Sequence, residues 1–312
     1  MANAISIHGL SKVYRSGFWR IPFTGLRSLT LDVPEGTAFG FVGPNGAGKT
    51  TTIKCLMGLQ KPTGGTAQIH GRPIADPECR RRVGFLPERP YFYEHLSARE
   101  FLDFYGRLCE VPSTLRTPRI ARLLERVDLA RFRDVPLGKF SKGMLQRAGL
   151  AQALMADPDL LVLDEPMSGL DPLGRVLVRD IILEERAAGK TVVFSSHILS
   201  DIETICDRVA IVVGGELRGL GTVAELLKQT VEHVDCEVRV TGDVGGTVLR
   251  QDDQHRVVRV EAHQVDALID RVRAAGGSVL AVHPRNKTLE EVLLDEVERA
   301  KPVIAKRLGV LA

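Results

Sequence analysis

The octet Gly-Pro-Asn-Gly-Ala-Gly-Lys-Thr at residues 43–50 is the part of this chain best suited to chemistry. An apolar run over 38–42 precedes it, and a helical pattern over 51–59 follows it. A glycine-rich turn between a strand and a helix aims backbone N–H groups at phosphates, and the helix N-terminus adds partial positive charge. Lys49 would reach the β- and γ-phosphates, and the Thr50 hydroxyl would bind Mg²⁺. The spacing predicts a nucleoside-triphosphate site made by Gly43, Asn45, Gly46, Gly48, Lys49, Thr50 and Thr51.

Two adjacent carboxylates, Asp164 and Glu165, offer a second chemical function. They follow the apolar run 160–163, which is typical of a buried parallel strand. Asp164 would hold Mg²⁺, directly or through water, and Glu165 would orient and polarise the attacking water. Two solvated acids at a strand end are the simpler alternative. A phosphate loop upstream favours the catalytic interpretation.

A third segment, Phe-Ser-Lys-Gly-Met-Leu-Gln-Arg at 140–147, opens a predicted helix shortly before the acidic pair. Ser141 stands at the expected N-cap, and the next amides could bind an anion. A capped surface helix is the simpler explanation. At this spacing, however, the segment resembles the Leu-Ser-Gly-Gly-Gln signature of ATP-binding-cassette (ABC) ATPases. Ser141 and Gly143 match that signature, whereas Lys142 and Met144 depart from it.

Further landmarks of that family follow in order. Residues 168–171 resemble its D-loop, which ends at Asp171, and His197 resembles its switch histidine. Tyr14 is the candidate for the aromatic residue that stacks on adenine, with Phe18 and Trp19 as alternatives. Glu88 stands where the family usually has the Gln of its Q-loop. The resemblance therefore implies Glu165 and His197 as catalytic residues, and Thr50, Asp164 and Glu88 as the Mg²⁺ ligands.

The resemblance also implies a mechanism and partners. Two ABC subunits sandwich two ATP molecules, each held by the phosphate loop of one subunit and the signature of the other. Ser141 and Gly143 would then contact a γ-phosphate bound to the partner's Lys49. We expect an ATPase that uses ATP and Mg²⁺, acts with a second ATPase subunit (an identical copy) and drives a separate transmembrane permease, most similar to prokaryotic exporters.

Composition narrows the class of protein. The chain has 44% apolar and 26% charged residues, as ordinary globular proteins do, and its net charge of +3 gives no reason to expect nucleic acid as a partner. No segment approaches the ~20 apolar residues of a membrane span, and no secretory signal pattern opens the chain. The five cysteines are scattered, which favours reduced thiols. We expect a cytoplasmic protein, peripheral on the inner face of the cell membrane.

The pattern of elements predicts two domains. Apolar strands alternate with helices over 1–228, as in a P-loop NTPase of the ABC type with a parallel or mixed sheet, and the helical pattern over about 88–157 predicts an inserted helical subdomain. Alternating strands and two helices over 229–312 predict a small α+β accessory domain. No phosphate loop or catalytic constellation is visible in that second region.

Two alternatives remain open from the sequence. The first is a soluble, non-transport ABC ATPase that acts on ribosomes or nucleic acid. One cassette, a short helical insert and a net charge near zero count against it. The second concerns the C-terminal domain, which could sense a small molecule or passively stabilise a dimer, and we favour the passive role.

Overall fold

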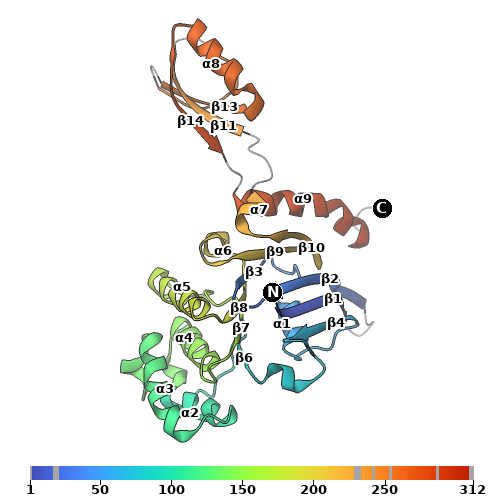
Figure 1. Ribbon diagram of the computed structural model, residues 1–312, viewed down its shortest axis with the longest axis vertical. Helices are drawn as coiled ribbons and strands as arrows, with labels where there is room; N and C mark the ends of the chain where they lie inside the picture. Colours follow the sequence, from blue (N-terminus) through green and yellow to red (C-terminus); the bar gives the residue numbers. More distant parts are fainter. Residues whose placement is uncertain are drawn as a thin grey trace. The chain divides into compact units, whose positions relative to one another are not determined.

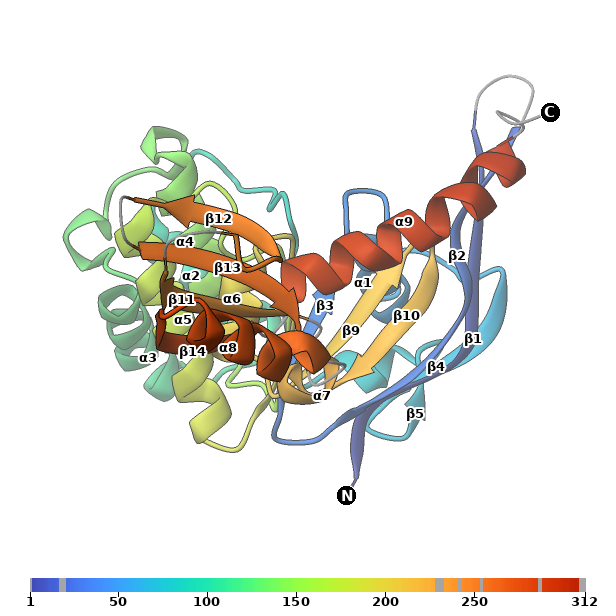
Figure 2. The ribbon, with the colours of Figure 1, turned by 90° about the horizontal axis from the view of Figure 1, so that it is seen from above.

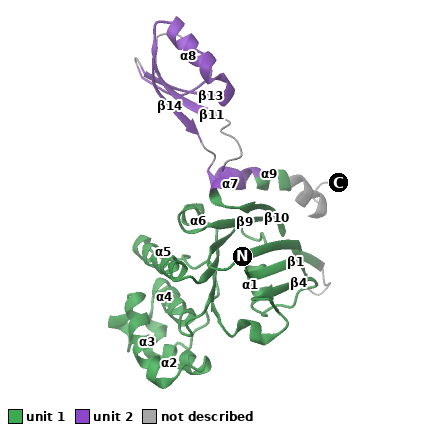
Figure 3. Ribbon diagram, in the orientation of Figure 1, with its two compact units in different colours: residues 1–223, 296–312 green, residues 224–295 purple. Residues whose placement is uncertain are grey.

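The computed structural model describes residues 2–16, 21–227, 233–240, 243–252, 255–285 and 288–308. Within these residues the chain divides into two compact units: residues 1–223 with 296–312, and residues 224–295 (Figure 3). These limits differ from the predicted ones at 228 and 229, and they assign the end of the chain to the first unit. None of the helices in the described ranges is both long enough and apolar enough to cross a membrane.

The centre of the first unit is a six-stranded sheet in the order β10-β9-β3-β8-β7-β6 (Figure 1). All neighbouring pairs are parallel except β9 and β10. Every residue of β3, β7 and β8 is buried, which explains the apolar runs at 38–42, 160–163 and 192–194. The strand bounds are β3 Ala38–Val42, β6 Val83–Leu86, β7 Leu160–Asp164, β8 Thr191–Ser196, β9 Arg208–Val213 and β10 Glu216–Gly221.

A second, antiparallel sheet has the order β2-β1-β4-β5. Its long hairpin consists of β1 (Asn3–Ser16) and β2 (Ile21–Pro34), and β4 (Gly64–Ile69) and β5 (Arg72–Pro73) complete it (Figure 2). One apolar core joins this sheet, helix α1 (Lys49–Leu56) and one face of the central sheet. Both sheets therefore help to hold the phosphate loop that precedes α1. The helix begins two residues earlier than the sequence pattern predicts.

The predicted helical insertion is present between β6 and β7. It contains α2 (Ala98–Leu108), α3 (Ser113–Arg126) and α4 (Lys142–Ala153), with short turns η2 (Ala130–Phe132) and η3 (Leu137–Lys139). Ser97 and Glu100 form a capping box that starts α2. Pro118 lies inside helix α3. Before the insertion, η1 covers Pro77–Arg80.

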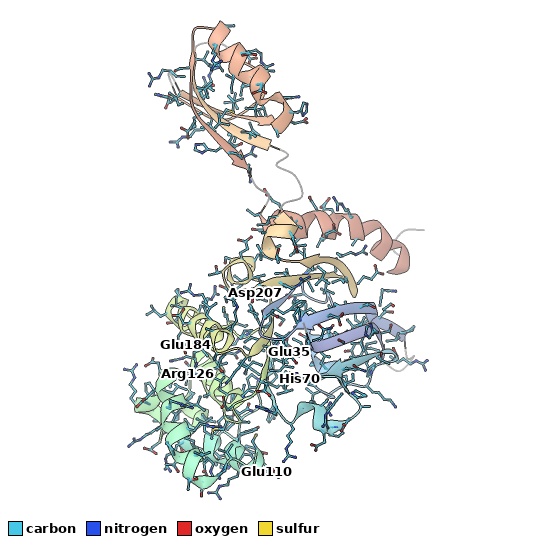
Figure 4. All side chains as sticks on the ribbon, viewed as in Figure 1. Glu35, His70, Glu110, Arg126, Glu184 and Asp207 are labelled. Atoms are coloured by element: carbon cyan, nitrogen blue, oxygen red, sulfur yellow. The ribbon has the colours of Figure 1, made fainter. Side chains whose placement is uncertain are left out.

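The remaining helices of the first unit are α5 (Pro172–Ala187) and α6 (Leu199–Ile205), whereas α7 (Val223–Leu227) lies at the boundary. An ion pair ties the insertion to the central domain: Arg126 of α3 contacts Glu184 of α5 at 2.7 Å and the buried Glu185 at 2.7 Å (Figure 4). This pairing fixes one border of the helical insertion. Exposed ion pairs add little stability, so Glu185 is the partner that matters most for the fold.

The second unit is a four-stranded antiparallel sheet in the order β12-β13-β11-β14 with α8 (Val265–Ala274) packed on it. Alternate residues of β11, such as Val234, Cys236 and Val238, point into a core shared with Leu268 and Val272 of α8. Its other elements are β11 (His233–Arg239), β12 (Thr247–Gln251), β13 (His255–Glu261), η4 (Ala262–Gln264), β14 (Ser278–Arg285) and the first part of α9 (Leu289–Leu308). The predicted α+β class is confirmed.

Candidate active site

A cavity of about 480 Å³ opens where the phosphate loop leaves β3. Most of the residues predicted from the phosphate loop line it, together with residues from four other segments. Its lining residues are Phe23, Gly25, Asn45, Gly46, Ala47, Gly48, Lys49, Thr50, Thr51, Glu88, Glu165, Ser168 and His197.

The loop conformation depends on glycine at two positions. A Cβ atom on Gly43 would lie 2.1 Å from the carbonyl oxygen of Val212, so the loop can pass β9 only without a side chain. Gly48 has a φ of 109°, and a Cβ there would lie 2.7 Å from the carbonyl oxygen of Gly25. The tight packing explains why the sequence needs glycine where the chain turns into α1.

Lys49 is fixed in the loop rather than free in solvent. Its side chain is 6% exposed, and its Nζ donates to the carbonyl oxygens of Gly43 at 2.6 Å and Pro44 at 3.3 Å. Burial lowers the pKa of Lys49, while the carboxylates of Glu165, Asp164 and Glu88 act in the opposite direction. Nζ lies 4.0 Å from Glu165 Oε1. The site thus holds a cation among three carboxylates, where it can meet phosphate oxygens.

Asp164 ends β7 with a carboxylate that is almost fully buried. It is 1% exposed and accepts hydrogen bonds from Ser195 Oγ at 2.7 Å and Thr50 Oγ1 at 3.1 Å. Burial raises the pKa of Asp164, the two hydroxyl groups lower it, and the charges of Glu88 and Glu165 raise it further. A cation at this point would relieve the repulsion among the carboxylates.

Glu165 and His197 are in contact. Glu165 Oε2 lies 2.7 Å from His197 Nδ1, and the Glu165 N–H donates to Ser195 Oγ at 2.9 Å. Glu165 has a φ of 53°, an uncommon conformation for a residue with a side chain. Gln146 Nε2 stabilises this turn by donating to the carbonyl oxygens of Glu165 at 3.3 Å and Pro166 at 3.2 Å. A strained, well-supported backbone is typical of functional positions.

The residues present fit Mg²⁺. Thr50 and Asp164 are in hydrogen-bond contact, and Glu88 lies on the cavity wall. Among the described residues, no group of three or more His, Cys, Asp or Glu side chains is close enough to hold a metal alone. Mg²⁺ is usually held by one or two carboxylates together with substrate phosphates, so this donor set suits an ion that arrives with a nucleotide.

Ser141, Gly143 and Asp171 are predicted to contact nucleotide but do not line the cavity, and neither does Gly43 of the phosphate loop. Ser141 Oγ accepts from the backbone N–H of Met144 at 3.2 Å and caps α4, and Asp171 Oδ1 accepts from Gly174 N–H at 2.9 Å and caps α5. Gly143 lies beside Leu170 and Gly169, because a Cβ there would be 3.4 Å from the Leu170 side chain. The signature segment therefore lies beside Gly169 and Leu170, and of residues 168–171 only Ser168 lines the cavity.

Tyr14 also lies outside the cavity lining. Its hydroxyl contacts Thr51 Oγ1 at 3.1 Å and donates to Gln60 Oε1, and its ring covers Gly25, where a Cβ would be 2.6 Å away. Phe23, the residue paired with Tyr14 across the β1–β2 hairpin, lines the cavity with 52% of its side chain exposed. Sequence reasoning missed Phe23. The alternatives Phe18 and Trp19 fall outside the described residues.

A phosphate loop after β3, an acidic pair at the end of β7 and a helical insertion between β6 and β7 define a P-loop NTPase. The family model named ABC transporter matches residues 26–168. An ABC transporter ATP-binding protein of Nostoc sp. is 42% identical over 93% of this chain and 88% of its own length. A daunorubicin resistance ATP-binding protein of Streptomyces coeruleorubidus is 32% identical over 93% of this chain and 92% of its own. The chain belongs to the ABC transporter ATP-binding proteins.

Solved structures agree with this assignment. The structure of an ATP-binding subunit of an ABC transporter has a TM-score of 0.66 and 32% identity, over 72% of this chain and 92% of that one. A dimeric ATP-binding cassette in a post-hydrolysis state, bound to ADP and phosphate, shares the fold with a TM-score of 0.65 at 23% identity, over 70% and 98% of the two chains. The chain is an ATP-binding subunit that uses Mg²⁺ and hydrolyses ATP, which confirms the predicted fold class and activity.

Proposed function

We propose that this chain powers a separate membrane-embedded permease, in the direction of export, through an ATP-driven dimer of two identical copies at the inner face of the cell membrane. The observation that carries the proposal is the division of the site. One chain brings together the phosphate loop, the acidic pair and His197, while Ser141 and Gly143 remain outside the cavity. The name of the Streptomyces relative, a drug resistance protein, supports export.

The surface around the signature supports a dimer. Leu173 and Val176, in the first turns of α5, are 79% and 42% exposed. They follow Asp171 directly and lie on the same helix that starts beside Gly143 and Leu170. Exposed apolar side chains next to polar anion-binding groups favour a partner surface. A second copy would supply Ser141 and Gly143 to the γ-phosphate held by the first copy's Lys49.

Within each site we assign the residue roles as follows, with the contacts as support. Lys49 would neutralise the β- and γ-phosphates, and Thr50, Asp164 and Glu88 would hold Mg²⁺, which would supply positive charge to the phosphates. Glu165 orients the attacking water and accepts its proton, because its carboxylate lies near Lys49 and is positioned by His197. Asp171 holds the start of α5, so that residues 168–171 keep a fixed path.

Phe23 is the aromatic residue that we assign to the adenine. Among the described residues that line the cavity, it is the one with a phenyl or indole ring, and half of its surface is available for stacking. Tyr14 positions α1 through Thr51 and supports Phe23, whose ring centre lies 6.4 Å from its own. The stacking on adenine that the sequence predicts for Tyr14 would then be made by Phe23, on the opposite strand of the hairpin.

Exposed aromatic side chains mark a surface for the permease. Tyr91 is 96% exposed and Tyr93 50% exposed, in the segment between β6 and α2. Glu88, which lines the cavity, precedes them by only a few residues. Exposed tyrosines are enriched where proteins bind partners, and this segment connects such a surface directly to the site.

Sedimentation with washed membranes of the source cells tests the proposal. We expect the wild type to sediment with membranes and the Tyr91→Ala/Tyr93→Ala variant to remain in the supernatant with unchanged ATPase activity of the isolated protein. Leu115→Ala, which removes another side chain of the insertion that is 53% exposed, is the matched control and should sediment normally. Sedimentation with ribosomes in place of membranes would instead support the non-transport alternative.

A further inference from the structure

Helices α5 and α6 pack against each other, and each begins at a segment of the nucleotide site. Helix α5 follows Asp171, and α6 starts two residues after His197. The link from Asp171 into α5 is rigid, because Asp171 Oδ1 accepts from Gly174 N–H and the Asp171 carbonyl accepts from Arg175 N–H at 3.0 Å. A displacement of residues 168–171 would therefore move the first turns of α5.

The two helices carry buried polar atoms without hydrogen-bond partners. Within the described part of the chain, these atoms include Nε of Arg175 on α5 and Oδ2 of Asp201 on α6. Burial raises the pKa of Asp201, while the charges of Arg175, Arg179 and His197 act in the opposite direction. The acid and the base are close enough to interact, yet each keeps a buried atom unpaired, which is costly and uncommon in folded proteins.

Helix α6 is held firmly on its other side. A Cβ on Gly40 of β3 would lie 2.7 Å from Cys206 Sγ and 2.9 Å from Ile202 Cδ1, so α6 packs directly on the strand. Ile202 is fully buried there. Asp201, whose Oδ2 is unpaired, directly precedes this anchored residue. Contact between Arg175 and Asp201 would consequently depend on movement of Arg175 with α5.

We propose that Arg175 and Asp201 form an ion pair during the ATPase cycle and that this pair couples residues 168–171 to His197. Asp201 is a positioning residue: it touches no nucleotide, but it fixes α6 so that His197 stays on Glu165, 2.7 Å away. When a second subunit displaces residues 168–171, Arg175 moves toward Asp201 and its Nε donates to Oδ2. The proposal rests on the role of His197 given above.

Steady-state kinetics of the full chain test the pair. We expect Asp201→Asn and Arg175→Gln each to lower kcat ~10-fold and to leave KM for ATP within ~2-fold, because the phosphate and base contacts are untouched. The double variant should be no slower than the slower single variant, since both changes remove one interaction. Arg179→Gln is the matched control. That arginine lies one turn further along α5, contacts Asp180 at 3.3 Å and should keep kcat within ~2-fold.

Three results would overturn the pair. They are wild-type kcat in Asp201→Asn, multiplicative losses of ~100-fold in the double variant, and an equal loss in Arg179→Gln. Asp201→Glu keeps the carboxylate and should recover most of kcat, and unfolding temperatures show whether any variant is merely unstable. His197→Ala separates this proposal from the proposed function. If His197→Ala keeps full ATPase activity, His197 has no catalytic role and the proposed function is wrong on that point. If His197→Ala is inactive but the losses of Asp201→Asn and Arg175→Gln multiply in the double variant, only the proposed coupling is wrong.

Discussion

The phosphate end of the cavity and the signature segment lie in one compact unit, yet only the first is assembled for chemistry. At the phosphate end, Lys49 donates to the loop carbonyl of Gly43 and pairs with Glu165. Asp164 accepts a hydrogen bond from Thr50. At the signature, the oxygen atoms of Ser141 and Asp171 cap their own helices and face no phosphate loop of this chain. The difference indicates that catalytic groups are preorganised, whereas completion of the site depends on another molecule.

The largest effect should come from the preorganised end. Lys49→Ala should remove detectable ATP binding, because the cation among the carboxylates is lost and their repulsion of phosphate remains. Glu165→Gln should keep ATP binding and lower kcat ~10³-fold, since the water loses its proton acceptor. Nucleotide binding and hydrolysis measured on the same preparations distinguish the two variants. Wild-type turnover by Glu165→Gln would remove Glu165 from catalysis.

Variants of the signature test whether completion needs a second chain. Ser141→Arg should bind ATP normally but hydrolyse it ~100-fold more slowly, because the arginine blocks the approach of the partner surface. An equal mixture with Lys49→Ala should recover about a quarter of wild-type activity, as half of the dimers would each carry one intact composite site. If Ser141→Arg alone is fully active, the signature takes no part in hydrolysis and the comparison fails.

A smaller effect should separate the two aromatic residues. Phe23→Ala should raise KM for ATP ~10-fold with little change in kcat, because stacking on a base is worth about 1–3 kcal/mol. Tyr14→Phe keeps the ring and loses only the contacts of its hydroxyl with Thr51 and Gln60, so it should change KM less than ~3-fold. Titrations with ATP and GTP measure both variants. A larger rise in KM for Tyr14→Phe than for Phe23→Ala would indicate that Tyr14, and not Phe23, contacts the adenine.

The sequence predicted the parts of the site that depend on local spacing. The phosphate loop and the pair Asp164 and Glu165 could be located because each follows directly from an apolar strand. Phe23 could not be chosen, since its place on the cavity depends on the register of the long β1–β2 hairpin. Likewise, the sequence pattern of α9 gives no sign of a division at Glu296, so the predicted boundary at 228 and 229 places the whole helix in the second domain.

The smallest expected effect concerns Glu88, which stands where the family usually has Gln. Glu88 lines the cavity, and its charge raises the pKa of both Lys49 and Asp164. If it is a ligand, Glu88→Ala should raise the Mg²⁺ concentration for half-maximal ATPase activity ~3-fold to ~10-fold, because one oxygen donor is lost. Glu88→Gln retains a carbonyl oxygen and should need an intermediate concentration. Mg²⁺ titrations at saturating ATP measure this order. Overlapping curves for the Ala variant and the wild type would show that Glu88 is not a ligand and that Thr50 and Asp164 are the protein ligands of the ion. The preorganised groups would then be those of the phosphate loop and of the end of β7.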